Sequence, residues 1–544
     1  MSTAELSPPA AEPAPKRFWG RVEDWLIRAG ERLNPILVKE ARQAMKSRLF
    51  SITFGLVLLA GWVWSIWGIA KFGPGAAFQA AGPQLFFGYY LILAAACIVV
   101  VPYGAFRSLA SECEDRTFEL LSITTLGPRQ IVAGKLGSAV LQLLIMFSAL
   151  APCLTFTYLL RGIDIVTIVV ALAYIGFAGL GLSMIALLLA TLTQERNSQN
   201  LLSVALLVGL LMCFSGIGSA GDSARHDFGS RRSGEIWSAL AMIFTFYATT
   251  LVLCFLAAAA RLTVVGQNRS TPLRVAMLAQ FLCGIGWFTA LLFILRNVGT
   301  EGFTTFLGFA GGYWYFMGVL MTGELAELSP RVRRSLPQTR PGKATLAWFF
   351  PGPGRGYLFA VANLATGVWL ALGVLWLKPF NLQTFSYGYM NYGDPIEKVS
   401  AFGVLLFCYV TIYLGLGKWI LSWLRRWFPQ GALLLSLVLH AALLGLGAGA
   451  PFAIAIFTRK NYTLLQLTNP FWTLNAVERG TEFTLFLLVA LPLAAVAVLA
   501  LNFPGLVAEL RLARTAQPER VAADEAARLA PRRPTKTSPW DGGE

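Results

Sequence analysis

The residues able to carry out acid–base, nucleophilic or metal chemistry are few in this sequence and lie far apart. There are two histidines, His226 and His440, and seven cysteines, none of them in a Cys-x-x-Cys pair. Metal and nucleophile sites need such groups at close spacing. The loop over 379–398, with Asp394 and Glu397, offers the one acidic pair that a membrane-embedded transferase could use. We therefore predict no metal ligands and no catalytic residues on this chain.

A nucleotide-binding loop is also missing. The nearest candidate runs from Gly127 to Lys135, with six residues between Gly127 and Gly134 where the phosphate loop has four. Leu136 follows the lysine in place of the hydroxyl residue that binds Mg²⁺. The glycine-rich run from Pro351 to Tyr357 has no lysine. ATP hydrolysis, if it drives this protein, is therefore predicted on a separate polypeptide, with no cofactor on this chain.

One stretch concentrates charge between two long apolar runs: SECEDRTFELLSITTLGPRQIVAGK, from Ser111 to Lys135. Its first part predicts a short helix over 111–123, and Gly127-Pro128 predicts a break followed by a new helix. The acids have two interpretations. Either they face a partner, or they pair with nearby arginines in an ordinary solvated loop.

The composition indicates an all-α polytopic membrane protein. The chain is 56% hydrophobic and 13% charged, with a mean hydropathy of +0.61, and its apolar runs of about 20 residues are long enough to cross a bilayer as helices. They predict about twelve transmembrane helices in two sets of six. The predicted spans are 49–70, 85–106, 136–160, 165–192, 199–219, 236–260, 276–296, 303–323, 356–378, 399–424, 431–457 and 482–503.

An amphipathic interface helix is predicted before the first span. Asn34 can cap it and Pro35 suits its first position. The apolar face comprises Val38, Ala41, Met45 and Leu49, and the polar face comprises Lys39, Arg42, Gln43 and Lys46. The predicted domains are a disordered basic N-terminus (1–33), two six-span domains (34–262 and 263–503) and a largely disordered tail (504–544).

Charge predicts the orientation. With both termini in the cytoplasm, about 33 of the 44 lysines and arginines face that side. The net charge of +16 then reflects membrane topology and not nucleic-acid binding, and membrane lipids are the expected neighbours. Within the spans, His440 is either a proton relay or a residue bonded to a neighbouring helix. Lys418 lies about two turns from the cytoplasmic end of its span, close enough for its amine to extend to the membrane surface.

The charged stretch resembles the conserved region of type-two ABC exporter permeases, the membrane subunits of ATP-driven export systems. The matching residues are Glu114-Asp115-Arg116-Thr117-Phe118-Glu119-Leu120-Leu121, then Thr124 to Val132, then Gly134-Lys135. The run NPILVKEARQ, with Asn34, Pro35, Lys39, Glu40 and Arg42, is similar to the interface helix of the same proteins. The chain departs from the pattern at Arg116, Thr125 and Gln130, where the family usually has Gly, Pro and Glu.

The resemblance implies a coupling helix that sits in a cleft of a cytoplasmic ABC ATPase, which would bind ATP and Mg²⁺. It implies that Glu112, Glu114, Glu119 and Arg129 face this partner, and Asp115, Arg116, Thr117 and Lys135 are assigned to the same coupling segment. The predicted protein is a permease subunit in a bacterial inner membrane. A membrane-embedded lipid or glycan transferase and a non-transporting scaffold are the alternatives. Either both halves of one chain form the pathway, or a second copy of the permease joins it.

Overall fold

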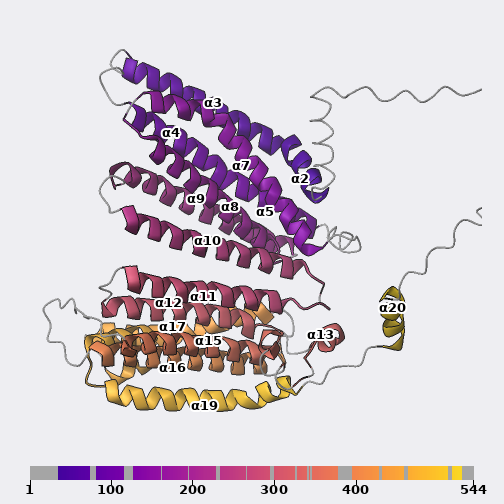
Figure 1. Cartoon of the computed structure of the whole chain (residues 1–544), viewed down its shortest axis with the longest axis vertical. Helices are drawn as coiled ribbons and strands as arrows, with labels where there is room; N and C mark the ends of the chain where they lie inside the picture. The colour runs from indigo at the N-terminus through magenta and orange to yellow at the C-terminus, as the bar shows by residue number, and fades with distance from the viewer. Residues whose placement is uncertain are drawn as a thin grey trace, which may run out of the picture. The chain divides into compact units, whose positions relative to one another are not determined.

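The computed structural model describes residues 35–73, 81–114, 127–160, 162–193, 195–227, 233–264, 266–294, 299–324, 328–337, 339, 342, 346–377, 395–427, 432–458, 463–511 and 518–529. Every regular element in these ranges is a helix. Eleven helices are long and apolar enough to cross a membrane. The prediction of an all-α, multi-pass membrane protein is therefore confirmed. The chain divides into two compact units, Met1–Thr263 and Val264–Glu544 (Figure 1).

Unit 1 contains a short helix, α2 (Pro35–Lys46), followed by long helices that supply six of the candidate spans. A 33-residue helix, Gly82–Glu114, is the most buried of these. It packs against α7 and α8, and helix α3 lies at the edge with an outward face of Leu, Ile, Val and Trp side chains. Such a face suits contact with lipid. The helices are α3 (Arg48–Phe72), α4 (Gly82–Ala94), η2 (Ala95–Val100), α5 (Val101–Glu114), α7 (Pro128–Leu159), α8 (Ile165–Ala190), α9 (Arg196–Asp227) and α10 (Ser233–Leu262).

The helix Gly82–Glu114 changes its hydrogen bonding midway. Over η2 it takes the wider π form, in which the Val101 N–H bonds to the Ala96 carbonyl five residues back. Pro102 follows directly and has no N–H to donate, so a regular α-helix would lose a bond and meet the proline ring here. The π turn carries the helix past the proline. It then continues without interruption to Glu114, so the prediction of a separate short helix beginning at Ser111 is wrong at its start.

Unit 2 supplies the other five candidate spans. Its most buried helix is α16, which packs against α12, α15, α17, α18 and α19. The elements are α11 (Ser270–Ile294), α12 (Thr300–Thr322), α13 (Pro330–Arg334), η3 (Ala347–Phe349), α15 (Pro353–Leu377), α16 (Pro395–Leu424), α17 (Ala432–Thr458), η4 (Leu464–Thr468), α18 (Pro470–Arg479), α19 (Thr484–Leu510) and α20 (Glu519–Leu529).

Helix α12 coincides with the predicted span 303–323 but is not among the eleven apolar helices. Its glycines, threonines and tyrosines lower its hydropathy. It packs against α11, α15, α16 and α17, and the side chains of Phe303, Leu307 and Trp314 are fully buried. The side of a helix that packs against other helices can carry more polar residues than a side that faces lipid.

Candidate functional site

In unit 1, helix α2 lies directly against the start of α7. A methyl group at Gly134 would come within 2.7 Å of Ile36, and one at Gly137 would come within 2.8 Å of Leu37. Both glycines face α2 because they are three residues apart on α7. They allow the two helices to approach closely, and this approach brings the polar residues of α2 to Lys135.

Lys135 is the centre of a buried polar cluster. Its side chain is 2% exposed, and its amine donates hydrogen bonds to Ser108 Oγ at 2.9 Å and to the Ser108 carbonyl at 3.3 Å. The amine also lies 3.2 Å from Glu40 Oε1 and 3.1 Å from Glu112 Oε2. The Ser108 hydroxyl in turn donates to Glu40 Oε2 at 3.0 Å. One cation therefore joins α2, the end of α5 and the start of α7; we call these four residues the Lys135 cluster.

The Lys135 cluster is suited to holding helices in register. The Lys135 amine forms ion pairs with Glu40 and Glu112 and donates hydrogen bonds to Ser108. Lys39 adds a weaker contact, 4.0 Å from Glu112 Oε1, from a mostly exposed side chain. Removing one partner of a buried ion pair typically costs about 3–5 kcal/mol. The base of the charged stretch is thus fixed to the interface helix.

The other predicted coupling residues lie around this base. Glu114, the last residue of α5, is half-buried, and Arg129, in the first turn of α7, is exposed. Gln130 closes that turn by accepting the Gly127 N–H at 2.9 Å. Asp115, Arg116, Thr117 and Glu119 lie outside the described residues, as does Asn34 of the interface helix. The family resemblance assigned Lys135 to the coupling segment and Glu40 to the interface helix, and the structure buries the two side chains against each other.

The interface helix is shorter than predicted. It ends at Lys46, and the Ser47 hydroxyl caps a new helix, α3, by accepting the Phe50 N–H at 3.2 Å. Leu49 therefore belongs to α3, and Met45 is 44% exposed. The buried face consists of Ile36, Glu40 and Ala41, so the predicted apolar face is correct only in part. The exposed face is cationic, and a shallow groove there is lined by Lys39, Arg42 and Lys46 together with Pro35, Val38 and Gln43.

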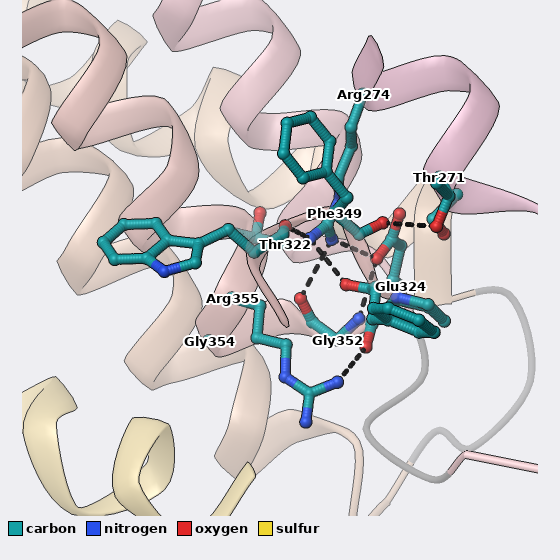
Figure 2. A network of polar contacts seen from close by, with 12 residues as sticks. Thr271, Arg274, Thr322, Glu324, Phe349, Gly352, Gly354 and Arg355 are labelled. Atoms are coloured by element: carbon teal, nitrogen blue, oxygen red, sulfur yellow. Dashed lines mark hydrogen bonds and ion pairs between the residues drawn. The ribbon is translucent and has the colours of Figure 1, made fainter. Parts of the chain in front are cut away.

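Unit 2 contains a second polar cluster, which the sequence analysis did not identify (Figure 2). Arg274, at the start of α11, is fully buried. Its guanidinium donates to the carbonyls of Trp348 at 2.6 Å, Phe350 at 2.7 Å and Gly352 at 3.2 Å, and to Glu324 Oε2 at 2.6 Å. The same carboxylate oxygen accepts the Gly352 N–H at 2.9 Å. We call this arrangement the Arg274 clasp.

Glu509, near the end of α19, continues this network at the start of α15. Its carboxylate accepts the N–H groups of Gly354 at 2.8 Å and Arg355 at 3.0 Å, and its carbonyl accepts from the Arg355 guanidinium. A carboxylate at a helix N-terminus satisfies free N–H groups and the helix dipole together. The glycine-rich run from Pro351 to Tyr357, which has no phosphate-loop lysine, therefore forms the start of α15, and the Glu509 carboxylate binds its free N–H groups.

His440 and Lys418, the two isolated ionisable residues that the sequence analysis considered within the spans, are buried between helices of unit 2. His440 Nδ1 lies 2.8 Å from the Ser436 carbonyl, and its other ring nitrogen points at Gly417, where a methyl group would be only 2.2 Å away. Lys418 is 8% exposed, and its amine lies 5.6 Å from the centre of the Tyr357 ring. The prediction that Lys418 extends to the membrane surface is therefore wrong. Among the described residues, no group of three His, Cys, Asp or Glu side chains could hold a metal ion.

Comparison of this chain with protein-family models, with curated proteins and with solved structures finds no match.

Proposed function

We propose that this chain is the membrane-spanning subunit of an ATP-driven exporter of the type-two ABC class, acting with separate cytoplasmic ATPase subunits. The observation that carries the proposal is the Lys135 cluster. It joins the interface helix to both helices that flank the charged stretch 111–129, and the order of these elements is the one that the family resemblance implies.

In this proposal, α12 is a twelfth crossing, so each unit has six. Its length of 23 residues is sufficient for a crossing, one side of it is buried against its neighbours, and Phe309 and Phe316 are exposed, as a lipid-facing side would be. Six crossings in unit 1 return the chain to the side on which it began. The N-terminus, the charged stretch, the loop after α12 and the tail then share the cytoplasmic face of a bacterial inner membrane, where most of the arginines and lysines lie.

The geometry suggests how a partner's movement would reach the membrane. An ATPase that displaces the stretch between Glu114 and Arg129 pulls on the ends of α5 and α7 together. Because Lys135 holds both ends and α2 within about 3 Å contacts, the three helices would tilt as a group. Such rigid-body tilting is one established route to alternating access.

The test is charge reversal of two acids in the stretch, Glu114→Lys with Glu119→Lys. Neither residue is part of the Lys135 cluster, so insertion and folding should be unchanged. Co-purification of an ATPase and coupled ATP hydrolysis should fall at least about tenfold, because reversed charges at a docking surface repel the partner.

The matched control is Glu301→Lys with Glu482→Lys, since both acids are exposed and lie at the opposite helix ends in the proposed topology. This variant should keep full coupling. If the Glu114 and Glu119 variant also keeps it, the proposed role of the charged stretch is wrong.

A further inference from the structure

The loop between α12 and α15 contains a short helix, α13, that is fixed to the rest of unit 2. Ser329 caps α13 by accepting the Val332 N–H at 3.3 Å, and the same hydroxyl donates to the Gly266 carbonyl at 2.8 Å. Beneath the helix, Leu328, Val332 and Leu336 form a small buried cluster with Phe350 packed against it. Residues 328–337 thus form a folded projection with an apolar base of its own.

The outward side of α13 is strongly basic. Arg331 is exposed, Arg333 and Arg334 are half-exposed, and none of the three forms an ion pair with any residue in the described part of the chain. Figure 1 shows α13 beyond the ends of the unit 2 helices. Three cations within four residues make a positive surface that a partner of opposite charge would neutralise.

Lipid headgroups and an acidic protein could both neutralise this charge, and the packing favours a protein. A helix that lies on a bilayer turns an apolar face toward the lipid. In residues 328–337 the three large apolar side chains are buried inside the loop itself, at 3–9% exposure. No apolar face is left to insert into a membrane, whereas a rigid basic projection suits an acidic protein surface.

We propose that α13 docks on an acidic face of an ATPase subunit, and that this subunit is a different polypeptide from the one that receives the acidic stretch of unit 1. This inference rests on the proposed function. In unit 1 the stretch 114–119 carries three acids and one arginine, whereas α13 carries three arginines and no acid. Two identical ATPase subunits would offer identical surfaces, and one of them would face a like charge. Two unlike subunits avoid this conflict.

The Arg274 clasp gives α13 a route for transmitting force. The loop that holds α13 leaves α12 at Glu324 and reaches α15 at Gly352, and the Glu324 carboxylate joins both ends to Arg274. Because Glu324, Gly352 and Arg274 are held together, a displacement that reaches these ends would pass to α11, α12 and α15 as one body.

The experiment places a photo-reactive phenylalanine analogue at Ser335, an exposed residue next to α13, and separately at Ser111, an exposed residue near the end of α5. The full chain is irradiated in the membranes of its host, and the adducts are identified by mass spectrometry. The Ser335 probe should label an ATPase with a complete phosphate loop, and the Ser111 probe should label a different ATPase polypeptide.

Two variants then test the charge. The first variant combines Arg331→Glu, Arg333→Glu and Arg334→Glu, and it should lower the yield of the adduct formed by the Ser335 probe at least about tenfold. The second variant replaces the same three arginines with lysine and should keep the yield. Gel filtration checks that both variants remain folded. Three outcomes would overturn the inference and keep the proposed function. In the first, only the Ser111 probe labels an ATPase. In the others, the Ser335 probe labels lipid alone, or both probes label the same polypeptide. Both ideas fail if neither probe labels an ATPase.

Discussion

Units 1 and 2 solve the same structural problem with different chemistry. In each, an acid at or just beyond the end of the second long helix meets a buried cation that also contacts the neighbouring elements. In unit 1 the acid is Glu112 and the cation Lys135, and every partner except one Ser108 carbonyl is a side chain. In unit 2 the acid is Glu324 and the cation Arg274, and three of the four acceptors of Arg274 are backbone carbonyls.

This difference separates a joint made between side chains from one made on the backbone. The Lys135 amine is a compact charge, and it holds α2, α5 and α7 together mainly through the side chains of Glu40, Ser108 and Glu112. The planar Arg274 guanidinium binds a folded loop through its backbone, and it can be released only if that loop refolds. Unit 1 is thus joined helix to helix, and unit 2 is joined helix to loop.

The largest effect is expected from Arg274→Met. The substitution leaves the Glu324 carboxylate and three carbonyls without their shared donor, which should lower the free energy of unfolding of unit 2 by about 3–5 kcal/mol. Denaturant unfolding in detergent, followed by tryptophan fluorescence, measures it. Arg331→Met is the matched control, because that arginine is exposed, and it should change stability by less than about 0.5 kcal/mol. Equal losses of stability in the two variants would show that the Arg274 clasp does not stabilise unit 2.

Lys135→Met should cost somewhat less, about 3 kcal/mol, because Glu40 and Glu112 are left as uncompensated charges. Adding Glu40→Gln and Glu112→Gln should recover part of that loss, since the repelling charges are then removed. Less recovery is expected in unit 2, where three of the four orphaned groups are backbone carbonyls, which no substitution removes. A triple variant as unstable as Lys135→Met alone would contradict the side-chain origin of the unit 1 cluster.

Glu509→Gln tests the long-range cap of α15. The amide oxygen can still accept a hydrogen bond, but the charge at the helix N-terminus is lost, and stability should fall by about 1–2 kcal/mol. The same denaturation measurement, compared with Glu519→Gln on an exposed position of α20, isolates the effect. An unchanged midpoint would show that the cap adds nothing to the clasp.

Asp164→Ala shows how much stability is lost when an ordinary helix cap, made by a residue next to the helix, is removed. Asp164 accepts the Thr167 hydroxyl at 2.5 Å and the Thr167 N–H at 3.1 Å at the start of α8. Loss of this cap should cost about 1 kcal/mol at neutral pH. The hydrogen bond from the Thr167 side chain lowers the pKa of Asp164 below its usual 3.8, so the stabilisation is present above that value. As the pH falls through the lowered pKa, the difference between wild type and variant should disappear.

Much of the fold could be predicted from the apolar runs, because lipid imposes both length and helicity on a membrane span. The sequence analysis missed the break at Ser47, since the apolar pattern continues across it, although a serine ahead of an apolar run is a recognisable cap signal. The contact between Glu509 and the α15 N-terminus had no signal, because its residues are 155 apart along the chain. The Lys135 cluster was not predicted, because Glu40 and Lys135 are 95 positions apart along the chain and Glu112 and Lys135 were assigned to a segment that faces a partner.

The π turn at Ala95–Val100 determines the direction, around the helix axis, of the side chains that follow it on that helix. Each residue of an α-helix advances the side-chain direction by about 100°, so one residue accommodated in a wider turn rotates the remainder by about that angle. Ser108 and Glu112, which both contact Lys135, follow the π turn on the same helix, so their direction includes this offset. Deleting a single residue from the turn would leave the span's length almost unchanged and swing both side chains away from the amine. The direction in which α5 presents Ser108 and Glu112 is thus set by a turn further back on the same helix.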